Sequence, residues 1–536
     1  MPEPRIEITK KYLRLYSYFD RDLIAQYKKI GMRWSPANKF WWGKITKIFI
    51  DSFLIVHPQF HDELKQYASK SFNFSQQTLS GYLKDHQRNS EALNHSRWGI
   101  WHDIGTGKSI LAIELIKQRD VKTLIVCPLS IIETTWMELI GEFAPELLDH
   151  AVNLWVLKKK NSRAGKMEFQ EELKNCKIGI INFESFRVIQ PDLEAAGFKM
   201  LIIDESSCIK SHNSKITKAL TGFSEDMDFA YPMSGNPAPN SEQEYWAQTQ
   251  IIKPMVFGKS FYAFRTKYFE SYGYGNFNWR MKEEKYKEFL SKLASISEVV
   301  RKEDVLDLPE KTDNVRRVFL TPAERKAYEE MEEHFVIEFG DQEIIAANAA
   351  VKLMKLREGT SGFYLDQDKN VFQVGESKIN ETKKLLEEIG HHQLIIWTHF
   401  HHEADQIEKL FHQMSKQRPI TWRRIDGTIK GQEIKNKSIQ EFKMSDVQYL
   451  VAHPGSLSRG QNLHNCSYML FFSLSHSYDY FDQCSGRIYR DGQKNKCSYY
   501  YLVAENSVDE GILRALKKKE NVVMSVFNYI KKKRGY

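Results

Sequence analysis

The sequence predicts an α/β protein with two parallel-sheet lobes, helical insertions and a small α+β module at the N-terminus. The main observation is a series of short apolar runs, each followed by polar or turn residues and then by a helical pattern. Such runs are typical of buried parallel strands, and the helical patterns between them are typical of crossover connections. The runs form an earlier and a later series, at 124–128, 178–181, 201–204, 394–397, 449–452 and 468–472.

The chain of 536 residues is too long for one hydrophobic core, so several folded units are expected. Between the two series of strands, Lys, Glu, Phe and Tyr recur at helical spacing, which indicates helical insertions. The predicted units are a basic, aromatic N-terminal module, a first lobe, a helical block with the inter-lobe linker, a second lobe and a basic tail, at 1–75, 76–245, 246–375, 376–515 and 516–536.

Positive charge is concentrated at the two ends of the chain. The net charge is +8, and residues 1–50 alone carry 11 Lys/Arg against 4 Asp/Glu. Two lysine-rich runs follow near the C-terminus, at 517–519 and 531–534. Basic ends on a near-neutral body favour a polyanionic partner, although solvated surface charge explains the C-terminal lysines equally well.

The composition argues against a membrane protein and against a zinc or disulfide framework. No apolar run approaches the roughly 20 residues that a membrane helix needs, and the N-terminus lacks the pattern of a secretory signal. The six cysteines form no Cys-x-x-Cys pair. A reducing interior is therefore the expected compartment.

A glycine-rich segment opens the first lobe. Residues 102–109 read His-Asp-Ile-Gly-Thr-Gly-Lys-Ser and precede a helical pattern. Glycines let backbone N–H groups surround a phosphate, and the helix N-terminus adds a favourable dipole. Lys108 would reach the β- and γ-phosphates of ATP, and Ser109 would hold Mg²⁺. His102 stands where the usual pattern has its first glycine. The predicted ATP-binding residues of this loop are Gly105, Thr106, Gly107, Lys108 and Ser109.

Two carboxylates follow an apolar run of the first lobe. Asp204 and Glu205 come directly after residues 201–203. Open α/β sheets bind ligands at the carboxyl ends of their strands. The pair is therefore predicted as catalytic: Asp204 would hold Mg²⁺, and Glu205 would orient or polarise the attacking water.

Two arginines in the second lobe complete the predicted site. Arg487 and Arg490 lie three residues apart, on one face of a predicted helical turn. Phosphoryl transfer gains from positive charge on the γ-phosphate, and an arginine in that role is typically worth about 10³–10⁵ in rate. The glycine-rich loop and the arginines are thus predicted as two half-sites that meet over one nucleotide.

Residues 76–515 resemble the Swi/Snf-type branch of the superfamily-two helicases and translocases. The resemblance implies two RecA-like lobes, ATP and Mg²⁺ as cofactors, DNA as partner, and Gln87 as the adenine contact. Seven segments in order carry it: 83–87 (adenine recognition), 102–109 (motif I), 204–210 (motif II), 234–240 (motif III), 301–309 (inter-lobe signature), 458–463 (motif V) and 483–493 (motif VI).

Two positions depart from the family pattern. Ser207 stands where motif II normally has histidine, and Asn236 stands where motif III normally has threonine. In the family these positions couple hydrolysis to lobe movement, and serine or asparagine can still form hydrogen bonds there. Gln483 and Gln493 of motif VI complete the predicted coupling set.

The resemblance also implies contacts to the nucleic-acid backbone. Segments similar to motifs Ia and Ib in the first lobe and to motifs IV and V in the second offer Ser, Thr, Asn and His side chains. Such groups bind phosphate without reading sequence, although ordinary polar groups at strand ends look alike. The predicted contacts are Ser130, Asn182, Ser185, Thr398, His399 and Ser458.

Residues 5–70 resemble the small basic module that precedes the motor of annealing helicases and of some phage helicases. The likeness is carried by the segment 18–24, by Arg33 and Trp34, and by Trp41 and its neighbour Trp42. Aromatic rings can stack on unpaired bases while basic groups neutralise phosphates. Arg33, Trp34 and Trp41 are predicted DNA contacts, and the alternative is that the tryptophans form the core of the module.

The sequence is therefore interpreted as an ATP-dependent DNA translocase that remodels forks or junctions by branch migration, fork reversal or annealing. It is expected to be a monomer without a membrane association, in the cytoplasm of a bacterium or of a phage-infected cell. Three alternatives stay open: a remodeller that displaces proteins from duplex DNA, a DNA-binding scaffold with a degenerate ATPase, and an RNA helicase.

Overall fold

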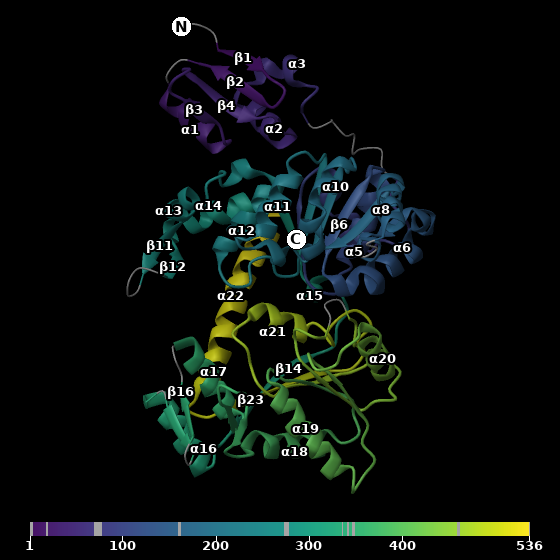
Figure 1. The fold of residues 1–536 in the computed structure, drawn as a ribbon, viewed down its shortest axis with the longest axis vertical. Coiled ribbons are helices and arrows are strands. Elements are labelled where there is room, and N and C mark those ends of the chain that lie inside the picture. The colour runs from purple at the N-terminus through teal and green to yellow at the C-terminus, as the bar shows by residue number, and fades with distance from the viewer. Residues whose placement is uncertain are drawn as a thin grey trace. The chain divides into compact units, whose positions relative to one another are not determined.

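The computed structural model describes residues 4–17, 20–68, 78–158, 162–272, 278–334, 336–339, 342–345, 349–457 and 461–534. The chain divides into two compact units, one of residues 1–305 with 523–536 and the other of residues 306–522. The first unit contains a small N-terminal module and a parallel-sheet lobe, and the second contains another parallel-sheet lobe (Figure 1).

The N-terminal module is an antiparallel sheet of order β1-β2-β4-β3 with helices on one face. Helix α1 begins after Asp20, whose carboxylate accepts hydrogen bonds from the backbone N–H groups of Asp22 and Leu23. This cap satisfies two donors that the first helical turn leaves free. The core includes Leu13, Leu15, Tyr27, Trp41, Phe49 and Phe53. The elements are β1 (Arg5–Ile8), β2 (Tyr12–Tyr16), α1 (Arg21–Lys29), β3 (Arg33–Ser35), β4 (Phe40–Lys44), α2 (Lys47–Val56) and α3 (His61–Leu64).

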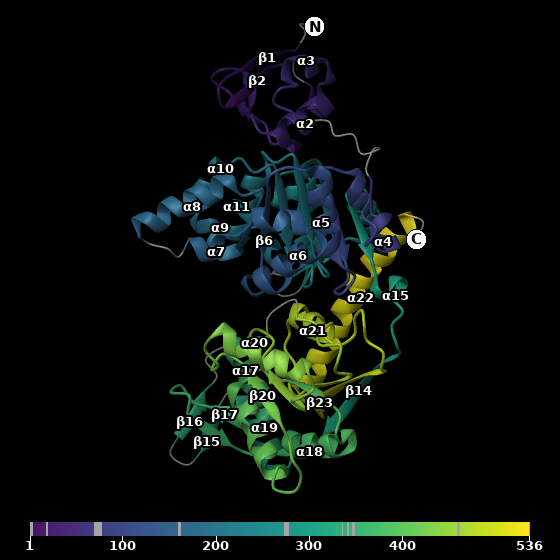
Figure 2. The ribbon, with the colours of Figure 1, turned by 90° about the vertical axis from the view of Figure 1, so that its right-hand side faces the viewer.

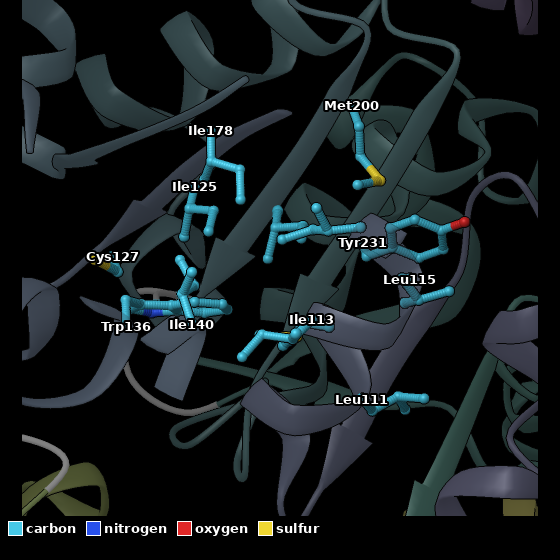
Figure 3. Close-up of a cluster of buried hydrophobic side chains, with 14 of the residues drawn as sticks. Leu111, Ile113, Leu115, Ile125, Cys127, Trp136, Ile140, Ile178, Met200 and Tyr231 are labelled. Carbon is cyan, nitrogen blue, oxygen red and sulfur yellow. The ribbon is translucent and has the colours of Figure 1, made fainter. Parts of the chain in front are cut away.

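The first lobe is built on a seven-stranded sheet of order β13-β5-β10-β9-β6-β8-β7, in which neighbouring strands run parallel. Alternate residues of a strand point to opposite faces. Ile125 therefore lies in one apolar cluster and its neighbour Leu124 in another, and Figure 3 shows the first cluster. The strands are β5 (Gly99–His102), β6 (Thr123–Cys127), β7 (Ala151–Asn153), β8 (Ile178–Asn182), β9 (Met200–Asp204), β10 (Phe229–Met233) and β13 (Ser297–Val300).

Helices cover both faces of this sheet, so that each strand is buried on two sides (Figure 2). This is why the strands appear in the sequence as continuous apolar runs. The helices are α4 (Asp85–Arg88), α5 (Lys108–Arg119), α6 (Glu138–Phe143), α7 (Leu154–Leu157), α8 (Arg163–Asn175), α9 (Phe183–Val188), α10 (Gln190–Ala195) and α11 (Lys215–Ser224).

An insertion rich in aromatic residues separates β10 from β13. Its helices enclose a cluster of rings around Phe264 and Phe289, whose centroids are 6.4 Å apart. A short helix, α15, follows β13 and ends the unit's main segment. The elements are α12 (Tyr245–Ile252), α13 (Phe261–Tyr268), β11 (Phe269–Tyr272), β12 (Asn278–Met281), α14 (Glu283–Ala294) and α15 (Lys302–Val305).

The second unit is built on a six-stranded parallel sheet of order β14-β23-β22-β19-β21-β20. Its central strands contribute Ile396, Val451 and Leu470 to one apolar core with helices α18 and α19. The strands are β14 (Lys311–Val318), β19 (Leu394–Trp397), β20 (Trp422–Ile425), β21 (Tyr449–Ala452), β22 (Tyr468–Phe471) and β23 (Cys497–Ala504).

The helices of the second unit lie between and after its strands, and two small hairpins accompany them. The long α22 begins after β23 and includes the stretch predicted as a basic tail, and it belongs to this unit up to residue 522 and to the first unit from residue 523 on. The helices are α16 (Pro322–His334), α17 (Ala349–Thr360), α18 (Ser377–Ile389), α19 (His401–Met414), α20 (Gln432–Lys443), α21 (Tyr478–Ser485) and α22 (Val508–Arg534), and the hairpin strands are β15 (Val336–Phe339), β16 (Gln342–Ile345), β17 (Phe363–Leu365) and β18 (Val371–Gln373).

The predicted fold class is confirmed, because both sheets are parallel and each of the six apolar runs forms one strand, β6, β8, β9, β19, β21 or β22. The stretch 246–375, predicted as helical, also contains eight strands among its described residues, β11 to β18. Six of them pair in three small hairpins, and the other two, β13 and β14, belong to the sheets of the first and the second lobe. Among the helices of the described ranges, none combines the length and apolar composition that a membrane crossing requires.

Candidate functional site

The phosphate loop joins β5 to α5 in the first lobe. Gly105 and Gly107 have φ angles of 92° and 83°, in the region that favours glycine, and Gly107 caps the helix that Lys108 begins. A Cβ atom on Gly107 would lie 2.4 Å from Nε2 of Gln87. The backbone of this turn therefore has the form of an anion cradle at a helix N-terminus.

Lys108 lies within this loop. Its side chain is buried, and Nζ donates hydrogen bonds to the carbonyl oxygens of His102, at 2.7 Å, and Asp103, at 3.0 Å. The hydroxyl of Thr106 donates to the same Asp103 carbonyl at 2.8 Å. Ser109 follows in the first turn of α5 and is partly exposed. The loop thus holds its own lysine in place through the carbonyls at its start.

Gln87, predicted as the adenine contact, lies directly against the phosphate loop. Its Nε2 donates to the carbonyl of Gly107 at 3.0 Å, and its Oε1 accepts from the backbone N–H of Lys84 at 2.8 Å. The adjacent His86 places Nε2 at 2.8 Å from the carbonyl of Thr106, and burial lowers the pKa of this histidine. The structure therefore brings the segment 83–87 and the loop together, as the family pattern implies.

His102, the residue that departs from the usual glycine, is anchored by a residue that sequence reasoning missed. Its Nε2 lies 2.9 Å from Oε1 of Glu298, which stands on the neighbouring strand β13. Glu298 also accepts from the hydroxyl of Ser90 and, at 2.7 Å, from the backbone N–H of Glu91. Burial raises the pKa of Glu298, but these hydrogen bonds, led by that of His102, hold the pKa below its usual value.

Asp204 and Glu205 stand at the end of β9. Oδ2 of Asp204 accepts from the indole Nε1 of Trp136 at 3.1 Å, and Oδ1 accepts from the backbone N–H of Glu205 at 3.0 Å. Burial, and then the charge of Glu205, raise the pKa of Asp204, while Lys108 opposes the shift. Glu205 has a φ of 59°, which is uncommon for a residue other than glycine and is typical of functional turns.

The phosphate loop and the two carboxylates lie at the same edge of the sheet. β10 lies between β5 and β9, and all three strands run parallel. The phosphate loop after β5 and the carboxylates after β9 are therefore one strand apart at the carboxyl ends, where open sheets bind ligands. The arrangement combines an anion cradle, a buried lysine and paired carboxylates, which suits a phosphate ester with a divalent cation.

Motifs II and III are tied together by Gln248 of α12, a residue without a sequence prediction. Its Oε1 accepts from the hydroxyl of Ser206 at 2.7 Å, and its Nε2 donates to the carbonyl of Pro237 at 2.5 Å. Ser207 and Asn236, the two predicted coupling residues, are buried, and each is the sequence neighbour of one of the two bridged residues. Within the described part of the chain, their side-chain polar atoms have no hydrogen-bond partner.

In the second unit, Arg487 and Arg490 share one acceptor. Both guanidinium groups donate to the carbonyl of Gln461, at 3.2 Å and 3.1 Å. The prediction that they lie on a helical turn is wrong, because α21 ends at Ser485 and both follow it in a turn. Burial, and then the charge of Arg487, lower the pKa of Arg490 to about 10, so it stays charged at neutral pH.

The two glutamines of motif VI have different surroundings. Gln483 is buried and donates a hydrogen bond within its own helix, to Asp479 at 2.8 Å. Gln493 donates from Nε2 to the carbonyls of Cys466 and Ile488, at 2.9 Å and 3.1 Å. Its Oε1 accepts from the backbone N–H two residues further on, at 2.9 Å. Gln493 therefore shapes the turn that carries the arginines.

The predicted DNA contacts of the first lobe are mostly buried. Asn182 ends β8, donates to Glu184 at 2.6 Å and exposes almost no surface, and Ser185 is buried in α9. A direct contact of these two side chains with a DNA backbone is therefore contradicted by their burial. Ser130, after β6, is partly exposed and stays a candidate.

In the second unit, Thr398 is buried, which contradicts a direct contact of its side chain with a DNA backbone as it does for Asn182 and Ser185, and His399 is partly exposed. The backbone N–H of His399 donates to Glu403 at 2.8 Å. Burial lowers the pKa of His399 well below its usual value, and Arg357, His453 and His476 lower it further. A neutral imidazole at this place can bond phosphate only as a neutral donor. Ser458 lies outside the described residues.

The predicted contacts of the N-terminal module separate into two faces. Trp41 is 7% exposed and packs against Tyr27 in the module core, so its prediction as a DNA contact is wrong. Trp34 is 44% exposed and lies on the same face, beside Trp41. Arg33 projects from the opposite face, over Trp42. Residues 18 and 19 lie outside the described ranges.

The signals for the missed residues were weak but present. Glu298 is a carboxylate within a short apolar run, and such a buried charge needs partners. Trp136 lies in a π-helical turn, Ile132–Met137, and its ring is part of the cluster drawn in Figure 3. Gln248 stands on α12, a helix whose residues are all buried. In each case the polar partner lies far away in the sequence.

Comparisons with known proteins agree with this geometry. Residues 78–384 match the family model described as SNF2-related domain, and residues 377–492 match the one described as helicase conserved C-terminal domain. A putative protein p41 from the Acyrthosiphon pisum secondary endosymbiont phage 1 is 22% identical, over 82% of this chain and 96% of that protein. An uncharacterized ATP-dependent helicase of Mycoplasma genitalium is 24% identical, over 83% of this chain and 42% of that protein.

Among solved structures, a SWI2/SNF2 ATPase core of Sulfolobus solfataricus, in complex with dsDNA, has 18% identity and a TM-score of 0.38, over 85% of this chain and 95% of that one. The chain spans 27% to 42% of the length of its yeast, plant and Mycoplasma relatives. The SNF2-related model alone covers more than half of the 536 residues. The chain therefore belongs to the SNF2-related family of helicases, and it is an ATP-hydrolysing enzyme.

Proposed function

We propose that the chain is an ATP-dependent DNA translocase that remodels forks or junctions. The observation that supports this best is the edge of the first sheet, where a buried lysine in a glycine turn lies one strand away from paired carboxylates. These parts of a phosphoryl-transfer site are all intact, which argues against the degenerate scaffold.

The residues at this edge fit ATP and Mg²⁺. Gly105 and Gly107 have positive φ angles, which let backbone N–H groups turn toward a phosphate, and a side chain at Gly107 would collide with Gln87. Lys108 would exchange its two carbonyl acceptors for phosphate oxygens. Ser109 and Asp204 would hold the cation, which would supply charge neutralisation to the phosphates. Burial, and then the like charge of Glu205, raise the pKa of Asp204, and a cation held there would stabilise the charged carboxylate against both.

Glu205 and the two arginines would perform the catalytic work of the chain. Glu205 is placed by its left-handed turn and would orient a water for attack on the γ-phosphate. Arg487 and Arg490 would stabilise the charge that develops there, as positive groups brought by the second lobe. Lobe closure on ATP and opening after hydrolysis would move the protein along DNA in small steps.

The preference for branched DNA rests on the N-terminal module. It carries most of the chain's net positive charge and is joined in one polypeptide to a motor that would follow duplex DNA. A module that binds a nucleic-acid strand, joined to a translocase, would hold the motor where single and double strands meet. Displacement of proteins from duplex DNA is the second candidate, since it needs the same motor chemistry.

The deciding experiment measures ATP turnover with single-stranded, duplex, forked and four-way DNA and with RNA. Forked or four-way DNA should stimulate most. Strongest stimulation by plain duplex would favour the protein-displacing remodeller, and strongest stimulation by RNA would exclude the proposal.

Two substitutions test the assigned site. Lys108→Ala should abolish DNA-stimulated turnover, and Glu205→Gln should lower kcat by about 10²–10³ while ATP still binds. Lys174→Ala, an exposed lysine at the end of α8, is the matched control and should be unchanged. Normal turnover in Lys108→Ala would show that the site is assigned wrongly.

A further inference from the structure

The face of the module's sheet that the helices leave uncovered carries aromatic and basic side chains. Directly opposed residues of antiparallel strands point to the same face. The register Glu7–Arg14–Trp42–Arg33 crosses all four strands in one row. The row next to it contains Trp41 and belongs to the core face. Figure 2 shows β1 and β2 on one side of the module and α2 and α3 on the other.

Four rings on this outer face form two contacting pairs. Tyr12 meets Trp42 with ring centroids 5.2 Å apart and the rings nearly perpendicular, at 89°. Tyr16 meets Phe40 at 5.5 Å. Tyr12 is 41% exposed, and the other three rings are half-buried. The rings therefore keep part of their surface open on a face that no helix of the module covers.

Three arginines lie over these rings. The guanidinium carbons of Arg5, Arg14 and Arg33 are 4.5, 5.2 and 5.6 Å from the ring centroids of Tyr16, Phe40 and Trp42. A guanidinium that stacks on a ring keeps its N–H donors free at the edge, where they can bind phosphate. The arginines are thus held in place before any ligand arrives.

The charge of this face is strongly positive. Lys44 adds a fourth cation, and Glu7 is the one carboxylate among the described residues of the face. Glu7 is already engaged by the Tyr16 hydroxyl at 3.0 Å and by Arg14 at 3.1 Å, and these bonds, led by Tyr16, lower the pKa of Glu7. The face therefore attracts an anion and repels a basic protein surface.

We propose that the outer face of β1-β2-β4-β3 binds unpaired DNA. Bases would stack on the guanidinium planes that lie over Trp42 and Tyr16 and on the part of these rings that stays open, and the edges of the guanidinium groups would bind the phosphates. Unpaired bases expose their ring faces, whereas a duplex hides them, so open rings select a single strand. The inference deepens the proposed function, because it names the surface with which the module would recognise a fork.

The test uses the full-length protein and anisotropy of a labelled oligothymidylate, with a labelled duplex as reference. Trp42→Ala should weaken oligothymidylate binding roughly tenfold, because each stacked base contributes substantially, and should leave duplex binding within about twofold. Ile55→Ala is the control. Ile55 is 62% exposed on α2, away from the outer face of the sheet, so its loss should leave both affinities unchanged.

If Trp42→Ala lowers the melting temperature of the protein, the same binding measurement is made with Tyr16→Ala instead. Unchanged oligothymidylate binding in a folded Trp42→Ala or Tyr16→Ala variant would overturn the inference, and so would an equal loss in Ile55→Ala. Tighter binding of oligouridylate than of oligothymidylate would overturn the choice of DNA.

The same samples separate this inference from the proposed function. If DNA stimulates ATP turnover but the aromatic variants bind oligothymidylate normally, only the assignment of the face fails. If oligothymidylate binding depends on Trp42 but no DNA stimulates turnover, the translocase proposal fails and the binding face stands.

Discussion

Glu298 is the residue through which β13 supports the phosphate loop. It anchors the ring of His102, whose carbonyl accepts a hydrogen bond from Lys108 at 2.7 Å. Glu298→Gln would keep the size of the side chain but remove its charge. The new amide group would also face the donors of His102, Ser90 and Glu91, which now bind the carboxylate. Hydrogen bonds to a buried charge are worth about 1.5–3 kcal/mol, so KM for ATP should rise roughly tenfold or more.

Steady-state ATP turnover measures this effect, and kcat should change less than KM because no reacting group is removed. Glu303→Gln, on the partly exposed side chain that follows in α15, provides the control and should leave KM unaltered. An unaltered KM in Glu298→Gln would mean that the loop holds its shape without the anchor.

Arg490 offers a different residue-scale prediction. It shares the Gln461 carbonyl with Arg487, and burial, and then repulsion by Arg487, lower its pKa without removing its charge. Arg490→Ala should lower kcat by about 10³ while ATP affinity is largely kept, because the group would act on the transition state. Nucleotide binding and turnover are measured separately, with the exposed Lys494→Ala as control. A loss of ATP affinity alone would show that Arg490 does not stabilise the transition state.

Among single residues, the sequence predicted the side chains that would act on ATP but not the side chains that hold them in place. Lys108, Asp204 and Glu205 could be found because their spacing from glycines or strands is local. Glu298, Gln248 and Trp136 act across the fold, on partners far away in the chain, and a single sequence carries no record of such pairs. The burial of Asn182 was missed for the same reason, and the sequence left Trp41 open between a DNA contact and the core of the module, where it lies.

The strands show the same division at the scale of elements. Continuous apolar runs such as β9 and β19 were predicted from their composition. β10 was missed because Pro232 interrupts it, and proline cannot donate to a ladder. β10 pairs with β5 at one described residue pair, Met233 with Ile100, so its proline costs little there. β14 is mostly polar, with Val315 and Val318 as its two apolar residues, and was masked by the helical composition around it.

The turn after α21 is an element that one side chain holds together. Gln493 forms three hydrogen bonds in it, two buried ones as donor and a partly buried one as acceptor. Gln493→Ala should cost about 2 kcal/mol, because buried backbone carbonyls lose their donors, and this lowers the melting temperature by roughly 4–8 °C for a unit of this size. Calorimetry of the full-length protein measures the shift.

Lys494→Ala removes the neighbouring exposed side chain and should leave the melting temperature unchanged. If Gln493→Ala melts normally but hydrolyses ATP without moving on DNA, the glutamine is a coupling residue rather than a structural one, as its place in motif VI implied.

At the scale of the whole molecule, both parallel-sheet lobes followed from the two series of apolar runs. The assignment of β13 and β14 did not follow, because each belongs to a sheet whose other strands lie elsewhere in the chain. The concentration of positive charge in the first 50 residues could be read directly. The face of the module on which that charge meets aromatic rings could not, since it depends on strand register.

Deletion of residues 1–75 tests what the module contributes to the complete protein. Each phosphate contact on a single strand adds about 0.7 to the slope of log affinity against log salt concentration. Loss of the four outer-face cations, at positions 5, 14, 33 and 44, should therefore reduce that slope by about 3 on forked DNA. Because the motor is retained, the slope and affinity on plain duplex should fall much less. Anisotropy titrations between low and physiological salt measure both, and equal losses on fork and duplex would contradict a junction-directing role.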